Sequence, residues 1–422
     1  MTGYAPPFDG VKTLHDLWES TCSRHSDEEC LGTRDVAPDG TPGAYRWMTY
    51  GQLYDRRAAC SSGYVAHGLK PGDHVGMYSV NTAEWCVLDS AMTRTALVSV
   101  PLYDTLGPDA VRFICNHAEL AAVCVSHACL PTMLGCLAEC PTVKLLVVYA
   151  HGGKPLPPTP AGAGHACKVV TIEQLEAEGR RRPVAPVPPR EEAMATICYT
   201  SGTTGDPKGV MLTHRNLISN AAAYADDLDL EPGDCHVSYL PLAHIYERVT
   251  MLVCLFAGAK AGFFRGDVLG LLDDIAELKP TVFCSVPRLW NRIYDKVHAG
   301  IREGGFVKQK MFAIAYAAKK KALEEGRAPP AIWEKIVFSK LRDKLGGRVR
   351  YMSTGSAPIS AQVMEFLRVC FGGTVFEGYG MTESACVISK THEDDFSCGH
   401  VGSPVPCCEI KLENVTEMNY TT

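Results

Sequence analysis

Short apolar runs alternate with helical segments between residues 45 and 148, and this alternation constrains the fold more than any other feature. The runs DHVGMYSV, ALVSVPLY, AAVCVS and VKLLVVYA cover residues 73–80, 96–103, 121–126 and 143–150. Short runs that are apolar throughout are typical of strands buried on both faces of a parallel sheet. Strands that alternate with helices predict a layered α/β architecture.

A segment rich in proline and glycine interrupts this rhythm at residues 151–190. We interpret it as a surface excursion between two structural units. The predicted organisation is a first α/β subdomain over residues 1–190 and a second over 191–400. Residues 401–422, which are strand-like and punctuated by proline, follow as a separate short region.

The net charge and the spacing of the cysteines argue against a nucleic-acid-binding protein and against a zinc site. The formal net charge is −6, and a nucleic-acid-binding protein usually shows a basic face instead. The nineteen cysteines are scattered, with no zinc-site spacing, which predicts free thiols in a reducing compartment. The N-terminus has no secretory pattern, so we expect an intracellular protein that is not secreted.

The stretch ICYTSGTTGDPKGV, residues 197–210, has the composition of a phosphate-binding loop. It does not fit the Walker loop of NTPases, because Gly202 and Gly205 are too close together and Gly209 follows Lys208 where Ser or Thr should stand. The loop also connects two predicted strands rather than a strand and a helix. Backbone N–H groups, three hydroxyl groups and Lys208 could hold phosphate there. A flexible hairpin turn is the alternative.

Three later segments also carry polar residues beside predicted strand ends. In SYLPLAHIYER, His244 follows a strand and a turn, although a packed histidine would look the same. STGSAP, residues 353–358, has small side chains that would let a flat ring approach the backbone, but it could be an ordinary turn. In FEGYGMTE, Tyr379 could stack on a base, and Thr382 and Glu383 offer oxygen ligands for Mg²⁺. A glycine-rich turn with an exposed acidic residue is the alternative there.

Taken in this order, the four segments resemble the adenylate-forming superfamily of acyl-CoA synthetases, luciferases and peptide-synthetase adenylation domains. Residues 98–111, 281–295 and 399–412 resemble long-chain fatty acyl-CoA synthetases, most closely the plant and algal peroxisomal type. The resemblance implies the large N-terminal domain of that fold, with residues 401–422 beginning a small β-barrel. It also implies an AMP-forming ligase that uses ATP, coenzyme A, Mg²⁺ and a long-chain fatty acid, in the peroxisome or on the cytosolic face of the endoplasmic reticulum or other membranes.

The resemblance also implies roles for individual residues. Thr200 and Glu383 would hold Mg²⁺, and His244 would lie beside the acyl carboxylate and the α-phosphate. The implied catalytic residues are Lys208, His244, Thr382 and Glu383. The implied ATP site comprises Thr200, Ser201, Gly202, Thr203, Thr204, Gly205, Lys208, Gly355, Ser356, Ala357, Glu377, Gly378, Tyr379, Gly380 and Thr382.

Members of the superfamily continue past the position that matches Thr422, through the rest of the barrel, a hinge and a C-terminal lid. We expect this chain to lack that lid, so two hypotheses stay open. One is a fatty acid–CoA ligase; the other is a fragment that binds nucleotide or fatty acid without turnover.

Residues 312–327, which include Lys319–Lys321, could form a peripheral contact with a membrane. A solvated amphipathic helix is the alternative for this segment.

Overall fold

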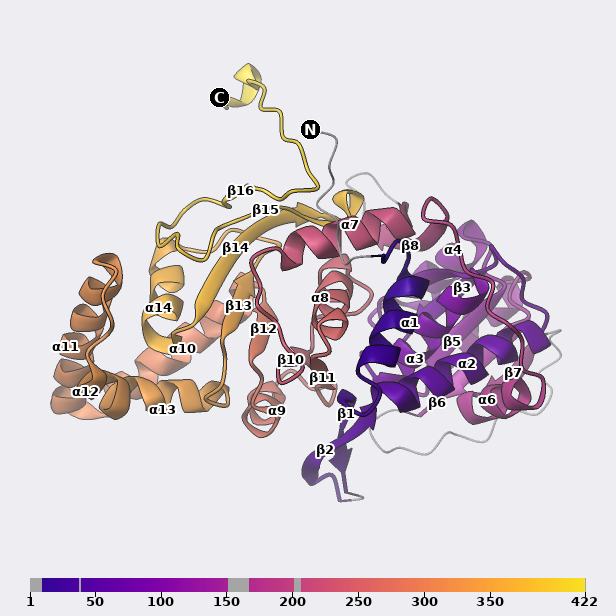
Figure 1. Ribbon diagram of the computed structural model, residues 1–422, viewed down its shortest axis with the longest axis horizontal. Helices are drawn as coiled ribbons and strands as arrows, with labels where there is room; N and C mark the ends of the chain where they lie inside the picture. The colour runs from indigo at the N-terminus through magenta and orange to yellow at the C-terminus, as the bar shows by residue number, and fades with distance from the viewer. Residues whose placement is uncertain (1–9, 38, 151–166, 201–205, 422) are drawn as a thin grey trace.

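Two β-sheets form the framework of the chain in the computed structural model, which describes residues 10–37, 39–150, 167–200 and 206–421 (Figure 1). Helices cover both sheets. Buried side chains of both sheets join those of helices lying between them, including α1 (Leu14–Arg24) and α8 (Ile245–Phe256), in one hydrophobic core. The predicted α/β architecture is therefore confirmed.

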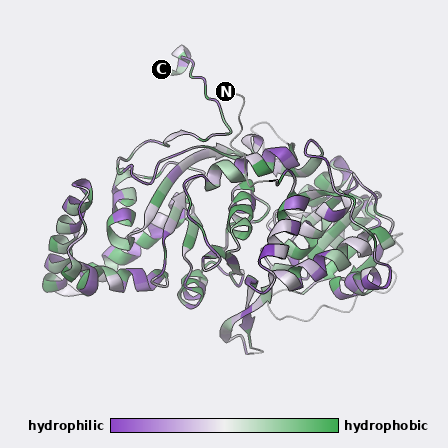
Figure 2. Cartoon of the chain, in the orientation of Figure 1, coloured by the Kyte–Doolittle hydropathy of each residue, from purple (hydrophilic) through white to green (hydrophobic). Residues whose placement is uncertain are grey.

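The first sheet is mainly parallel and contains the apolar runs that the sequence analysis identified as strands. Its order is β7-β6-β5-β3-β4-β8-β9, and only the β8–β9 pair is antiparallel. Every residue of β4, β5 and β6 is buried, and Figure 2 shows the apolar interior of this sheet. The strands are β3 (His74–Tyr78), β4 (Val98–Leu102), β5 (Ala122–Ser126), β6 (Leu145–Tyr149), β7 (Lys168–Thr171), β8 (Met194–Thr200) and β9 (Lys208–Thr213).

The second sheet has nine strands in the order β16-β15-β14-β13-β12-β10-β11-β1-β2. Its centre, from β14 to β1, is parallel, and the strands at both ends pair antiparallel. The strands are β1 (Glu29–Val36), β2 (Pro42–Thr49), β10 (Cys235–Ser238), β11 (Lys260–Phe263), β12 (Val282–Ser285), β13 (Tyr351–Thr354), β14 (Thr374–Met381), β15 (Cys386–Lys390) and β16 (Ser403–Pro404).

Several helices begin at threonine caps that can be read from the sequence. The Thr213 hydroxyl accepts a hydrogen bond from the Asn216 N–H at 3.1 Å, and α7 begins at the next residue. The helices are α1 (Leu14–Arg24), α2 (Tyr50–Ala66), α3 (Ala83–Met92), α4 (Pro108–His117), α5 (Leu130–Cys136), α6 (Ile172–Arg181), α7 (His214–Ala225), α8 (Ile245–Phe256), α9 (Leu271–Leu278), α10 (Pro287–Glu303), α11 (Gly305–Glu324), α12 (Ala331–Trp333), α13 (Ser339–Arg342) and α14 (Ala361–Phe371).

The division between the sheets does not follow the boundary expected at residue 190. Strands β8 and β9 lie after that residue but belong to the first sheet, because β8 pairs with β4. Strands β1 and β2 lie before it but belong to the second sheet, because β1 pairs with β11. After β16, the described residues up to 421 contain one isolated bridge, Val415 with Tyr420, and the start of a β-barrel there stays a prediction.

The sequence analysis placed Lys319 in a segment, residues 312–327, that could contact a membrane, and the structure contradicts this for Lys319. Lys319 is buried, with its Nζ 2.5 Å from the Glu334 carboxylate and 4.4 Å from the centre of the Phe338 ring. It therefore belongs to the interior and cannot meet a lipid surface. Within the described ranges, no helix combines the length and apolar character needed to cross a bilayer.

Candidate active site

One cavity of about 530 Å³ lies where β13 and β14 of the second sheet meet the start of α8 and the β8–β9 hairpin. It brings together ten of the residues that the sequence analysis selected from four separate segments. They are Thr200, Lys208, His244, Gly355, Ser356, Gly378, Tyr379, Gly380, Thr382 and Glu383.

Other selected residues do not line this cavity or lie outside the described residues. Ala357 is exposed beside it. Glu377 is buried in β14, where its backbone N–H donates to the Thr391 hydroxyl at 3.0 Å and burial raises the pKa of its carboxyl group. The centre of the predicted phosphate loop, Ser201, Gly202, Thr203, Thr204 and Gly205, lies outside the described residues.

The two ends of that loop are fixed by strand pairing. Thr200 ends β8 and Lys208 begins β9, and these two residues are direct partners in the antiparallel register. A hairpin of this kind places both side chains at the same edge of the sheet. Both residues line the cavity, so a hydroxyl and an ammonium group reach it from the first sheet.

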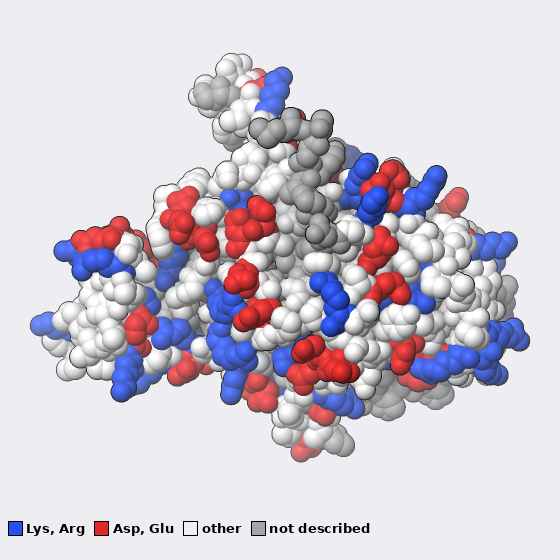
Figure 3. Space-filling model, in the orientation of Figure 1, with Lys and Arg blue, Asp and Glu red and all other residues white. Residues whose placement is uncertain are grey.

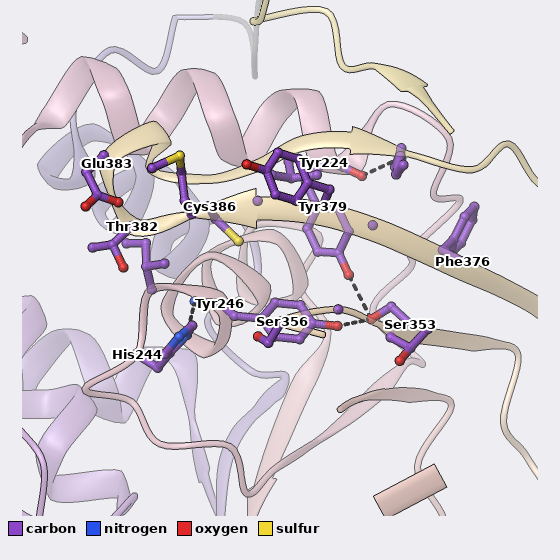
Figure 4. A pocket seen from close by; sticks show the side chains of 18 of the residues that line it. Tyr224, His244, Tyr246, Ser353, Ser356, Phe376, Tyr379, Thr382, Glu383 and Cys386 are labelled. Carbon is purple, nitrogen blue, oxygen red and sulfur yellow. Dashed lines mark hydrogen bonds between the residues drawn. The ribbon is translucent and has the colours of Figure 1, made fainter. Parts of the chain in front are cut away.

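His244 is the N-cap of α8, and its side chain lines the cavity (Figure 4). Its Nδ1 accepts a hydrogen bond from the Tyr246 N–H at 3.2 Å. Burial is the main cause that lowers the pKa of His244, which favours the neutral ring. With Nδ1 as an acceptor, the single proton of that ring is on Nε2.

Glycines let the backbones around the cavity approach closely. A Cβ on Gly355 would lie 3.3 Å from the Gly378 carbonyl oxygen, and a Cβ on Gly380 would lie 1.8 Å from that of Cys386. Ser356, the residue after Gly355, has a backbone φ angle of 69°, which lies in the left-handed region. Tyr379, between the two glycines of β14, is 51% exposed, so one face of its ring is free for a flat ligand.

Three hydroxyl groups meet on the inner wall of the cavity (Figure 4). The Tyr246 and Tyr224 hydroxyls lie 2.6 Å and 3.1 Å from Ser353 Oγ. Burial raises the pKa of both phenols well above the ordinary tyrosine value, so both remain neutral. Tyr246 and Ser353 lie in segments that the sequence analysis quoted, but nothing in the sequence pointed to Tyr224.

Lys390 is a second cation on the cavity wall, and the sequence analysis missed it. Its Nζ donates to the Tyr224 carbonyl oxygen at 2.8 Å and lies 3.3 Å from the Asp227 carboxylate. The ammonium also lies 5.3 Å from the centre of the Phe376 ring. Burial lowers the pKa of Lys390 despite these partners.

A comparison with known protein families shows the family of this chain. The profile of the AMP-binding enzyme family matches residues 18–422, which include every residue of the cavity. The chain belongs to the AMP-binding enzyme family.

Within this AMP-binding family, the chain is similar to peroxisomal long chain acyl-CoA synthetases. It is 50% identical to long chain acyl-CoA synthetase 7 of Arabidopsis thaliana, over 99% of this chain and 59% of that protein. It is 38% identical to long-chain-fatty-acid–CoA ligase 1 of Cavia porcellus, over 98% of this chain and 59% of the relative. The chain thus spans about three fifths of the length of these relatives.

Solved structures show the same fold. The A domain of a carboxylic acid reductase from Segniliparus rugosus, solved with AMP and a co-purified carboxylic acid, matches with a TM-score of 0.75 at 24% identity, over 98% of this chain and 65% of that one. A long-chain-fatty-acid-CoA ligase from Archaeoglobus fulgidus matches with a TM-score of 0.69 at 19% identity, over 94% and 69%. The predicted fold of adenylate-forming N-terminal domains is therefore confirmed.

The donors of this cavity fit a magnesium ion that would arrive with a nucleotide. Thr200 and Glu383 supply a hydroxyl and a carboxylate on the cavity wall. Among the residues that the structure describes, no group of three or more His, Cys, Asp or Glu side chains could hold a metal by itself. Mg²⁺ commonly binds through one or two protein oxygens together with phosphate oxygens and water, so two donors are sufficient.

Proposed function

We propose that this site activates a long-chain fatty acid with ATP and then transfers the acyl group to coenzyme A. The observation that carries the proposal is the single cavity, which gathers hydroxyl, cationic, imidazole, aromatic and carboxylate groups from four separate segments. The similarity to long chain acyl-CoA synthetases at 50% identity supports the same substrates.

In the first step, a carboxylate oxygen bonds to the α-phosphorus of ATP, and the bond from that phosphorus to the bridging oxygen breaks. Pyrophosphate leaves with the electron pair. Two anions must approach each other, so the protein has to neutralise charge and align the reacting groups. Lys208 and Lys390 are cations on the cavity wall, and a neutral His244 would donate from Nε2 to a carboxylate or phosphate oxygen.

In the second step, the thiolate of coenzyme A attacks the acyl carbon, and AMP leaves with the oxygen that belonged to the carboxylate. Tyr379 would hold adenine against Gly355, which follows β13, and the glycines of β14, where a flat ring can approach the backbone. Thr200 and Glu383 would hold Mg²⁺, which would neutralise phosphate charge.

Lys208→Ala tests the proposal. If Lys208 neutralises charge that develops on the phosphates, its loss should reduce fatty-acid-dependent ATP–pyrophosphate exchange about 10²-fold or more. Lys70→Ala, which removes an exposed lysine outside the cavity, should leave exchange unchanged. An unchanged exchange rate in Lys208→Ala would refute the role of the loop.

A second candidate function is binding of nucleotide or fatty acid without turnover. The same cavity would be sufficient for this binding alone. Calorimetric titration with ATP, together with mass spectrometry of acyl-AMP and acyl-CoA, separates the two candidates. Measurable ATP binding with neither product would favour the binding function.

For localisation we propose the peroxisome, because two of the similar proteins are named as peroxisomal. The cytosolic face of the endoplasmic reticulum is the alternative. Fractionation of the full-length protein, with markers for both organelles, distinguishes them.

A further inference from the structure

Helix α11 has apolar side chains on its outward face as well as on its inward face. The inward row, Phe312, Ala315 and Ala322, is buried in the core of the second sheet's helices. On the outward side, Phe306 and Val307 are 76% and 78% exposed, and Ile314 is 50% exposed. A surface helix normally presents polar side chains to solvent, so this outward face is unusual.

The exposed residues form one continuous stripe. At about 100° of rotation per residue, Phe306, Val307 and Ile314 fall within an arc of roughly 100°. Lys310, Ala317 and Lys321 fall within the same arc, and Ala313 borders it. We call this set of residues the outward stripe. It lies opposite the buried row.

The outward stripe lies in the most basic part of the sequence. Residues 302–348 contain twelve Lys and Arg against five Asp and Glu, a net charge of +7, whereas the whole chain carries −6. The Lys310 ammonium lies 5.9 Å from the centre of the Phe306 ring, so charge and apolar surface adjoin. The acidic side chains of α11 come at its end, with Glu324.

Helix α11 lies at one end of the long axis of the molecule, far from the first sheet (Figure 1). Figure 3 shows a broad uncharged area at this end, bordered by Lys and Arg and, at its upper side, by acidic residues. No residue of α11 lines the active-site cavity. A partner on this face would therefore leave the cavity open.

We propose that the outward stripe of α11 docks on the surface of a lipid bilayer that contains anionic phospholipids. A helix that combines exposed Phe, Val and Ile with lysines in the same arc lies at the interface, with its apolar side chains among the acyl chains and its ammonium groups at the headgroups. The exposed lysines of this stripe, Lys310 and Lys321, complement an anionic lipid surface. This inference does not depend on the proposed catalytic function.

The test is co-sedimentation with vesicles of three parts phosphatidylcholine to one part phosphatidylserine, and with vesicles of phosphatidylcholine alone. The test variant is Phe306→Ser with Val307→Ser. The matched control is Val268→Ser with Leu269→Ser, because these apolar neighbours are 53% and 78% exposed beside the acidic start of α9. All four side chains are exposed, so both variants should fold, and urea unfolding verifies this.

We expect binding to the mixed vesicles that weakens with salt, and a loss of about tenfold or more in the Phe306/Val307 variant but not in the control. Lys310→Glu with Lys321→Glu should also weaken binding to the mixed vesicles. Absence of binding, equal binding by the test variant, or equal binding to neutral vesicles would overturn the proposal. Self-association of the wild type that the test variant abolishes would assign the stripe to a second copy instead.

Discussion

Replacing Lys390 with methionine should separate the contribution of this buried lysine to stability from its contribution to catalysis. Methionine keeps most of the length of the side chain and its apolar contact with Phe376, but it removes the charge. The change leaves the Tyr224 carbonyl oxygen and the Asp227 carboxylate without the Lys390 ammonium group.

The expected loss of stability is small because two effects oppose each other. A hydrogen bond to a charged group contributes about 1.5–3 kcal/mol. The ion pair with Asp227 adds less, since the Asp227 side chain is 19% exposed and partly solvated. Against this, burial lowers the pKa of Lys390, so the site disfavours the ammonium form more than its partners favour it. We expect the free energy of unfolding to fall by about 1–2 kcal/mol.

The expected loss of activity is larger, because both proposed substrates are anions and Lys390 is on the wall of their cavity. Fatty-acid-dependent ATP–pyrophosphate exchange should fall about tenfold or more. In the wild type, exchange should also decline as the pH rises through the lowered pKa of Lys390, because the ammonium loses its proton there. The methionine variant should lack this decline.

Lys319→Met is the matched control. Lys319 is equally buried, pairs with Glu334 and lies over the Phe338 ring, but it is remote from the active-site cavity. Urea unfolding and exchange should be measured for both variants. Lys319→Met should lose stability and keep its exchange rate per folded molecule. If Lys390→Met behaves in the same way, Lys390 is a structural residue and the reasoning is refuted.

Three more predictions concern the described residues. Burial lowers the pKa of His214 from 6.5 to about 4, so the unfolded chain binds this proton more readily, and about 3 kcal/mol of stability should be lost as the pH falls from 6.5 to 4. Urea unfolding across this range should show a weaker pH dependence in His214→Gln. Gly380→Ala should distort the β14–β15 pairing and reduce ATP binding measured by calorimetry, because its Cβ would lie 1.8 Å from the Cys386 carbonyl oxygen; unchanged affinity would contradict this. Glu383→Gln should raise the Mg²⁺ concentration needed for half-maximal exchange, and an unchanged requirement would remove Glu383 from the metal site.

Local sequence signals predicted the parts of the fold that local interactions determine. The apolar runs of β4, β5 and β6 are buried on both faces, as their composition requires. Thr213 begins a helix because its hydroxyl caps Asn216 three residues away. The expected boundary at residue 190 does not follow the sheets, because sheet membership depends on pairing between distant segments, such as β1 with β11.

The same distinction applies to the site. His244, Tyr379 and Glu383 lie in segments whose glycines, prolines and hydroxyl groups are visible in the sequence. Tyr224 and Lys390 are instead placed by the packing of α7 against β15, which joins residues 166 positions apart. An isolated lysine at the end of a short strand carries no local signal of burial.

Lys319 shows why a charge pattern alone was misleading for α11. Three consecutive lysines at 319–321 suggest a solvated or lipid-facing surface, but a helix turns by about 100° per residue, so consecutive side chains point in different directions. Lys319 turns inward to Glu334, and Lys321 turns outward to the stripe that carries Phe306 and Ile314. Because both faces of α11 contain apolar residues, periodicity could not indicate which face is buried. The Lys319–Glu334 ion pair and the packing of Phe312 and Ala315 determine that orientation, and they leave Phe306 and Val307 exposed at the start of the helix.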